Sequence, residues 1–271
     1  MIRVEELGGR TRLRAVSAES SQYKGSGVKI GVLQCDDVAE PLQAAHGNYP
    51  DMVCRWLGAA DPRLEFQVWA CHKGELPDAR ADVDAWVLGG SKHSVNDDEP
   101  WIHALTDFVR ERWRRQQPLA GICFGHQMIA RALGGSVAVD PHGWGVGIYS
   151  SRLAGREPWM SPWPGDTLNL LASHREQVQT LPESARLLAG SPFCPNYLMQ
   201  VGDTVLGLQG HPEFSRSFAA DLMTLRRGTL IPEIRVTAGL QSLFLPVHDQ
   251  IMARWFLRFL RRAGRPARVA A

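Results

Sequence analysis

The chain lacks the features that mark several protein classes. No uninterrupted apolar run approaches the roughly 20 residues that a membrane-spanning helix needs, so we expect no membrane partner. The formal net charge is only +2 over 271 residues, which argues against a surface that binds nucleic acid. The beginning of the sequence has no apolar core of a secretion signal. Together these absences favour a cytoplasmic protein.

Signals for a metal, a cofactor or a disulfide framework are also missing. No histidine pair has a ligand spacing with a partner carboxylate, so we expect no metal. The glycine-rich run 143–147 precedes a strand-like pattern, whereas a phosphate-binding loop opens a helix, and we therefore expect no nucleotide cofactor. The cysteines are odd in number and scattered, which is typical of a reducing compartment. They stand at positions 35, 54, 71, 123 and 194.

What the sequence does contain is a regular alternation of apolar runs and helical patterns from residue 28 onward. Such alternation predicts an α/β fold with a mostly parallel sheet and helices on both faces. The hydrophobic content of 44% is enough for one substantial core, so a single domain is expected. The expected strands are 28–35, 64–71, 83–88, 119–123 and 206–210. The expected helices are 41–57, 101–113, 126–133, 215–227, 232–240 and 246–262.

The two ends of the chain differ from this domain. Residues 1–27 are polar and are expected to form a flexible arm, the domain spans 28–264, and residues 265–271 form a tail. In the last expected helix four arginines share one face. That face is either solvated or a docking surface for an acidic partner. The four are Arg254, Arg258, Arg261 and Arg265.

The most informative motif is a thiol at the end of an apolar run. Pro118, Leu119 and Ala120 lead into Gly-Ile-Cys-Phe-Gly-His-Gln, with the cysteine at position 123. This pattern predicts a buried strand that turns sharply into a helix, in the manner of a nucleophile elbow. The partial positive charge of the helix N-terminus favours thiolate over thiol. We therefore predict that Cys123 is a nucleophile.

A second motif supplies the base that such a thiolate needs. The run 206–210 ends in His211-Pro212-Glu213, where the proline restricts the backbone of both itself and the preceding histidine. Glu213 can accept from one ring nitrogen of His211 while the other nitrogen faces the thiol. Cys123, His211 and Glu213 are thus predicted to form a catalytic triad.

These two motifs resemble those of the class I glutamine amidotransferases, whose nucleophile lies in a Gly-hydrophobic-Cys-x-Gly-His-Gln elbow and whose base lies in Gly-His-Pro-Glu. The resemblance implies a flavodoxin-like three-layer fold. The sequence Ser173-His174-Arg175-Glu176 and the loop 91–101 resemble the γ-glutamyl peptidase branch. Amidotransferase domains of the GMP-synthase type are similar in the same motifs.

The resemblance also implies roles for residues beyond the triad. The oxyanion formed during attack is expected to be held by the N–H groups of Phe124 and Gly90. The loop after Gly90 departs from the family because Ser91 stands in place of proline. Arg175, where many members have glycine, is either a solvated cation or a binder of carboxylate. The substrate-binding residues implied are Gln127, Ser173, Arg175 and Glu176.

The function implied is a cysteine-dependent amidohydrolase. It would cleave the γ-amide of glutamine, or of another γ-glutamyl compound, through a γ-glutamyl thioester. The alternative is a glutaminase subunit that delivers ammonia to a separate synthetase partner, since the chain has no nucleotide-binding loop of its own. The sequence does not indicate an oligomeric state.

Overall fold

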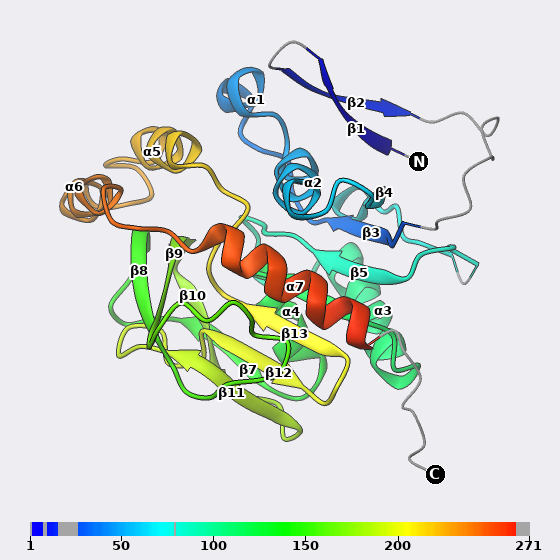
Figure 1. Ribbon diagram of the computed structural model, residues 1–271. Coiled ribbons are helices and arrows are strands. Elements are labelled where there is room, and N and C mark those ends of the chain that lie inside the picture. Colours follow the sequence, from blue (N-terminus) through cyan, green and yellow to red (C-terminus); the bar gives the residue numbers. More distant parts are fainter. Residues whose placement is uncertain (1, 8–9, 16–26, 79, 264–271) are drawn as a thin grey trace.

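A mixed sheet forms the centre of the computed structural model, which describes residues 2–7, 10–15, 27–78 and 80–263 (Figure 1). In these residues the sheet has 11 strands. Their spatial order is β2 (Arg10–Ala15), β1 (Ile2–Leu7), β4 (Glu65–Ala70), β3 (Lys29–Gln34), β5 (Ala85–Leu88), β6 (Leu119–Ile122), β13 (Val205–Leu208), β12 (Leu198–Val201), β11 (Ala185–Gly190), β8 (Gly145–Leu153) and β9 (Thr167–His174). A smaller sheet pairs β10 (Glu176–Thr180) with β7 (Ser136–Val139).

The middle of the large sheet is parallel, as the sequence predicts. The strands β4, β3, β5, β6 and β13 pair in parallel with one another, in that order. Every residue of β5, β6 and β13 is buried. Continuous apolar runs of this kind are typical of parallel strands that are covered on both faces. The predicted fold class, α/β with helices on both faces of the sheet, is confirmed.

One end of the sheet has an arrangement that the sequence analysis did not foresee. Strands β12, β11, β8 and β9 extend the parallel core by antiparallel pairing. Strands such as β8 and β11 mix buried with exposed positions, so they give weaker apolar runs than the central strands. This extension matters for the site because β9 ends beside it.

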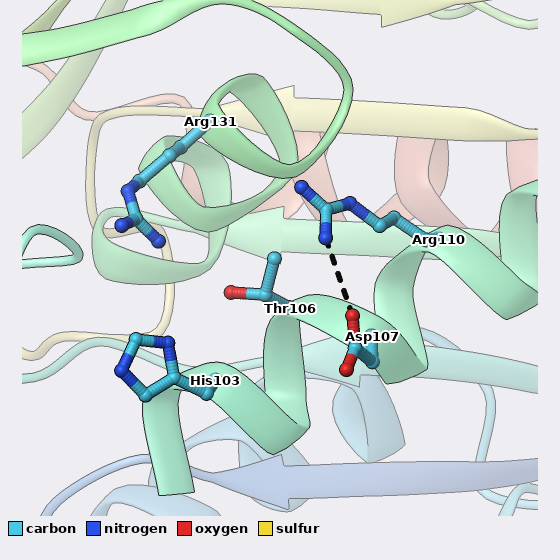
Figure 2. A pocket seen from close by; sticks show the side chains of 5 residues that line it. All are labelled: His103, Thr106, Asp107, Arg110 and Arg131. Carbon is cyan, nitrogen blue, oxygen red and sulfur yellow. Dashed lines mark hydrogen bonds and ion pairs between the residues drawn. The ribbon is translucent and has the colours of Figure 1, made fainter. Parts of the chain in front are cut away.

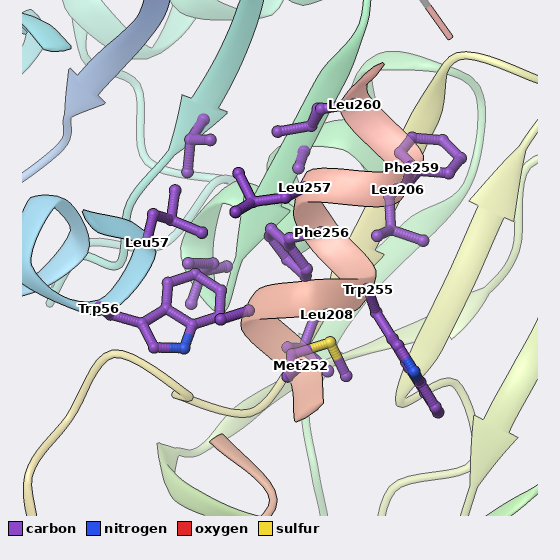
Figure 3. Packing of buried hydrophobic residues seen from close by; sticks show 14 of the residues in the cluster. Trp56, Leu57, Leu206, Leu208, Met252, Trp255, Phe256, Leu257, Phe259 and Leu260 are labelled. Atoms are coloured by element: carbon purple, nitrogen blue, oxygen red, sulfur yellow. The ribbon is translucent and has the colours of Figure 1, made fainter. Parts of the chain in front are cut away.

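Helices cover both faces of the parallel core. On one face lie α2 (Tyr49–Ala60) and α7 (Asp249–Ala263), which pack on each other and on the sheet. Figure 3 shows α7 directing Met252, Phe256 and Leu260 toward this core, where they meet residues of α2 and β13. On the opposite face lie α3 (Pro100–Arg114) and α4 (Phe124–Ala132). The central strands β5, β6 and β13 are thereby shielded from water on both faces.

The expected helix 41–57 is two helices, so that prediction is wrong in its extent. The first is α1 (Glu40–His46), and α2 begins after it. Gly47 has a φ of 76°, which ends the first helix. The side chain of Asn48 then caps α2 in a reciprocal pair with Asp51. Tyr49 is the first residue of α2, and the capping fixes its position at the edge of the site.

Two further helices, α5 (Arg216–Leu225) and α6 (Glu233–Ser242), lie together beyond β8 and β9 (Figure 1). The predicted helices 215–227, 232–240 and 246–262 correspond to α5, α6 and α7, with ends shifted by a few residues. In the described residues no helix is both long enough and apolar enough to cross a membrane.

The ends of the chain are described only in part. Within the predicted arm, β1 and β2 pair antiparallel, and Ile2 of β1 pairs with Phe66 of β4. The remaining positions of the arm and the tail 265–271 lie outside the described residues, and the flexibility of the arm stays a prediction. Of the basic face on α7, Arg254 and Arg258 are exposed, and Arg261 forms an ion pair with Asp61. Arg265 lies outside the described residues.

Candidate active site

Cys123 stands at the turn between β6 and α4. Its φ of 52° and ψ of −102° are unusual for a residue with a side chain, and such backbone strain is concentrated at functional sites. Its backbone N–H donates to the carbonyl oxygen of Leu208 at 2.8 Å, which fixes the turn to the neighbouring strand β13. The residue is 5% exposed. The thiol is therefore held in a single place at the start of a helix.

Gly121 and Gly125, on either side of Cys123, are needed because neighbouring atoms leave no room for a side chain there. The unusual backbone angles of the turn belong to Cys123 itself. A Cβ on Gly121 would lie 2.4 Å from the backbone of Gly125. A Cβ on Gly125 would lie 2.6 Å from the backbone oxygen of Leu88. Neither distance is compatible with a side chain. The glycines therefore do not leave the thiol exposed, because the surrounding packing buries it.

Parallel pairing of β6 with β13 brings the predicted triad together. Ile122 is directly opposite Leu208, so both strands end at the same edge of the sheet. The chain leaving β13 carries His211, whose Nδ1 donates to Oε1 of Glu213 at 2.7 Å. This assigns Nδ1–H to the carboxylate and leaves Nε2 for the thiol. His211 is also fixed through its backbone N–H, which donates to the carbonyl oxygen of Leu171 in β9 at 2.7 Å.

The charge on His211 depends on its two partners. Burial by itself lowers the pKa of this imidazole, but the Glu213 carboxylate and the Cys123 side chain outweigh it, so the pKa is raised to about 10. The side chains of His211 and Glu213 are only 4% and 2% exposed. Phe214 covers one face of the imidazole, with ring centroids 3.9 Å apart and ring planes 10° apart. The arrangement favours an imidazolium beside the thiol.

Gly90, the predicted second oxyanion donor, lies against the side chains of both His211 and Cys123. A Cβ at this position would be 3.1 Å from Cε1 of His211 and 3.8 Å from Cβ of Cys123. The carbonyl oxygen of Gly89 accepts from the N–H of Gly125 at 3.2 Å, which joins this loop to the elbow. Phe124 is the first residue of α4, where backbone N–H groups have no partner within the helix. Both predicted donors thus belong to segments that adjoin the thiol.

A small cavity of about 20 Å³ adjoins the thiol, with space for about one water molecule. Two of the residues around it, Tyr49 and Arg226, were not predicted from the sequence. The guanidinium of Arg226 donates to the hydroxyl of Ser173 at 3.4 Å and lies 5.9 Å from the centre of the Trp144 ring. The cavity is lined by Tyr49, Gly90, Ser91, Cys123, Ser173, His211, Phe214, Leu222 and Arg226.

The structure places one of the predicted substrate-binding residues at the cavity and the other three outside its lining. Ser173 lines the cavity. Gln127 is buried behind it, where its amide donates to the backbone oxygen of Glu176 at 2.8 Å and to the side chain of Gln209 at 3.1 Å. The carboxylate of Glu176 accepts from the hydroxyl of Ser94 at 2.8 Å, and Arg175 is exposed. Neither is part of the cavity lining, and direct contact of these three residues with a substrate stays a prediction.

Two other histidines, His126 and His174, lie close to the triad but are not paired with Glu213 or Cys123, the partners of His211. Burial lowers the pKa of His126 to about 4. Burial also lowers the pKa of His174, to about 3, and the nearby His211 adds to that effect. Both rings are therefore neutral near pH 7. This separates them from His211, the predicted base, whose pKa is raised.

A larger cavity, of about 460 Å³, lies between α3 and α4 (Figure 2). It contains none of the triad residues. Its one carboxylate, on Asp107, pairs with Arg110 at 3.2 Å. Although this cavity is larger than the one beside Cys123, we do not assign it as the catalytic site, because no triad residue lines it. The lining residues are His103, Thr106, Asp107, Arg110 and Arg131.

Known proteins share both the sequence pattern and the fold. The family model of class-I glutamine amidotransferases matches residues 49–225. The chain is 28% identical to gamma-glutamyl peptidase 3 of Arabidopsis thaliana over 70% of this chain and 77% of that protein. It is 32% identical to a glutamine-hydrolyzing GMP synthase subunit of Sulfurisphaera tokodaii over 49% of this chain and 68% of that protein. A glutamine amidotransferase from Thermotoga maritima has a similar fold, with a TM-score of 0.67 at 20% identity, over 88% of this chain and 99% of that one.

Proposed function

Since the chain belongs to the class-I glutamine amidotransferase family, we propose that it is a hydrolase that cleaves a γ-glutamyl amide through a thioester on Cys123. The observation that carries the proposal is the buried pair of His211 and Glu213 beside a thiol at a helix N-terminus. A nucleophile, a base and a group that orients the base are the minimal requirements of such chemistry.

The first half of the reaction uses the thiolate and the imidazolium. The sulfur of Cys123 attacks the γ-carbonyl carbon, and the carbonyl oxygen takes up negative charge between the N–H groups of Phe124 and Gly90. When this oxyanion collapses, the carbon–nitrogen bond breaks, and His211 donates its proton to the departing amine. A γ-glutamyl thioester remains on the enzyme.

The second half reverses the role of His211. Glu213 and the Cys123 side chain raise the pKa of this imidazole, and formation of the thioester removes the contribution of Cys123. The ring, which has just given its proton to the amine, can then accept another. It takes one from a water molecule that attacks the thioester. Glutamate leaves, and the proton returns the Cys123–His211 pair to its starting state. Glu213 keeps the ring in one orientation throughout and forms no bond to the substrate.

The position of Arg226 supports the proposal that the substrate carries a carboxylate. Its guanidinium borders the same cavity as the thiol and points to the hydroxyl of Ser173. A guanidinium binds carboxylate through paired hydrogen bonds. The α-carboxylate of a γ-glutamyl group would provide such a partner. The cavity of about 20 Å³ is too small for a glutamyl group, so its walls must move apart when substrate enters.

The test is release of amine or ammonia by the purified chain from glutamine and a panel of γ-glutamyl amides and peptides. We expect turnover of a γ-glutamyl compound well above that of glutamine. Cys123→Ala should abolish turnover while the protein stays folded, and Glu213→Ala should reduce it less severely. Full activity in Cys123→Ala would rule out the mechanism.

A second candidate function follows from the similarity to the GMP synthase subunit of Sulfurisphaera tokodaii. In that case the chain hydrolyses glutamine only when a synthetase docks, and ammonia passes to the partner. The same assay separates the two functions. Negligible turnover of every compound, with Cys123 still alkylated by a glutamine-like electrophile, would favour this second function.

A further inference from the structure

An exposed apolar surface lies on α6 and the loops at its two ends. Among residues 27–78 and 80–263, for which the structure describes side chains, seven large apolar side chains are exposed, and five of them fall between Leu225 and Leu245. Phe244 is 92% exposed and Ile234 is 78% exposed. Large apolar side chains gathered in one place, in contrast to single scattered ones, mark an interaction site. The five are Leu225, Leu230, Ile234, Phe244 and Leu245.

Along α6 the exposed positions form one stripe. Residues three and four apart share a face of a helix, and the inner face is packed by Val236 and Gly239. A Cβ on Gly239 would lie 2.6 Å from the sulfur of Met223, so the helix cannot turn to hide its outer face. None of the stripe residues carries a charge. The α6 stripe consists of Ile234, Thr237, Ala238 and Gln241 on the helix, together with Phe244 and Leu245, which follow its end.

Charges of opposite sign stand at the two ends of the α6 stripe. Glu233 is exposed at the beginning of the helix. At the other end lies Arg216 of α5, also exposed, whose guanidinium donates to the carbonyl oxygens of Leu243 and Leu245 on either side of Phe244. Arg235, on the same turn as Glu233, lies outside the stripe, and its guanidinium donates to the carbonyl oxygen of His142. Glu233 is therefore the charge next to the stripe at its first end, and Arg216 is the charge next to it at the other.

When two copies of this surface face each other in opposite directions, the acidic end of each copy meets the basic end of the other. We propose that the α6 stripe is the interface of a homodimer, in which α6 of one copy packs antiparallel on α6 of the other about a two-fold axis. In that arrangement Glu233 of each copy faces Arg216 of the other, and Ile234 faces the region of Phe244 and Leu245. A parallel arrangement would place like charges together. Two-fold interfaces use the same patch on both subunits, which requires this kind of self-complementarity.

The middle of the stripe suits the close approach that the dimer needs. Thr237 and Ala238 are small, so two helix axes can approach to the 8–10 Å or so of packed helices. The apolar ends then act as anchors, since a few large side chains carry most of the binding energy of an interface. The stripe has far fewer residues than the roughly 20–30 that each partner contributes to a standard interface, so the dimer should dissociate on dilution.

The experiment is sedimentation velocity of the full chain over a dilution series. The wild type should shift from dimer toward monomer as it is diluted. Phe244→Asp should weaken the dimer by about thirtyfold or more, which corresponds to the 2 kcal/mol or so of an interface hot spot. The matched control is Val139→Asp, since Val139 is 48% exposed on β7 outside the stripe and should leave dimerisation unchanged.

A charge exchange tests the antiparallel geometry directly. Glu233→Arg and Arg216→Glu should each weaken the dimer when studied alone, because each places like charges together. Mixed in equal amounts, the two variants should form a heterodimer, since both end pairs are then of opposite charge. Circular dichroism checks that each variant is folded. A wild type that remains monomeric at its highest soluble concentration, or a dimer indifferent to Phe244→Asp, would overturn the proposal. If both single variants are folded and their mixture stays monomeric, the antiparallel arrangement is wrong.

Discussion

The carboxylate of Asp36 accepts two hydrogen bonds from Lys92, one from the backbone N–H and one from the ammonium, each at 2.9 Å. Asp36 follows the end of β3 and is buried, and Lys92 stands two residues after Gly90. The backbone contact therefore fixes the loop that presents the proposed oxyanion donor. Charge-assisted hydrogen bonds of this type are stronger than neutral ones.

Loss of this anchor should slow catalysis. We expect Asp36→Ala to lower kcat about tenfold to 100-fold, somewhat less than the loss of a whole oxyanion donor. Lys92→Met is the matched control, because it removes the exposed ammonium and keeps the backbone N–H, and it should change kcat by less than about threefold. Steady-state kinetics checks both, with thermal unfolding to confirm that the variants are folded. Equal kcat in all three proteins would contradict the anchoring role.

The two neighbouring glycines of this loop offer a sharper comparison. Gly90→Ala would bring a methyl group to 3.1 Å from the ring of His211, so the ring or the loop must shift and kcat should fall about tenfold or more. Gly89→Ala meets only the backbone oxygen of Leu33, at an ordinary 3.7 Å, and should retain nearly full activity. The kinetics of the two variants, measured side by side, decide the point. A Gly90→Ala enzyme as active as Gly89→Ala would show that position 90 does not touch the catalytic geometry.

The raised pKa of His211 gives the pH dependence of the first step. The imidazolium donates the proton to the leaving amine, and a group whose pKa is raised to about 10 keeps its proton below that pH. We therefore expect the rate of thioester formation to stay level between about pH 7 and 9 and to fall as the pH rises through about 10. Stopped-flow measurement of the amine burst across this range is the check. A fall centred near the ordinary histidine value of about 6.5 would mean that Glu213 and Cys123 do not hold the proton.

Arg226 should act on substrate binding. We expect Arg226→Gln to raise KM about tenfold to 100-fold with a smaller change in kcat, because a charge-assisted contact to carboxylate contributes about 1.5–3 kcal/mol. Arg227→Gln, at the adjacent position, is the control for a general loss of positive charge. An amide substrate without a carboxylate should be indifferent to Arg226→Gln. If KM for the γ-glutamyl substrate is unchanged, the carboxylate contact does not exist.

The triad could be predicted from sequence because each half of it is local. The bend at Cys123 and the pair of His211 and Glu213 occupy a few consecutive residues each, and apolar strands lead into both. That the two halves meet follows from the rule that parallel strands end at one edge of a sheet. The central strands were equally clear, because their residues are apolar without interruption.

No comparable sequence motif marked Arg226 or Tyr49 as a residue of the site. An arginine at the end of a helix is ordinary, since cations are favourable there, and Arg226 ends α5. Tyr49 was hidden inside a single predicted helix, although Gly47 and Asn48 end one helix and cap the next. Both residues reach the site only through tertiary packing of α5 and α2. Gln127 and Arg175 belong to a recognised motif but do not line the cavity, and their contact with a substrate stays a prediction.

The pairing of β6 with β13 also bears on the order in which parts of the protein fold. These strands lie far apart in the chain, and between them the chain forms an entire antiparallel extension. Long-range parallel pairing forms late, because a large loop must be closed before its contacts are gained. During synthesis Cys123 therefore leaves the ribosome well before the strand that carries its base. We therefore expect Cys123 to meet its base only after the chain between the two strands has been made.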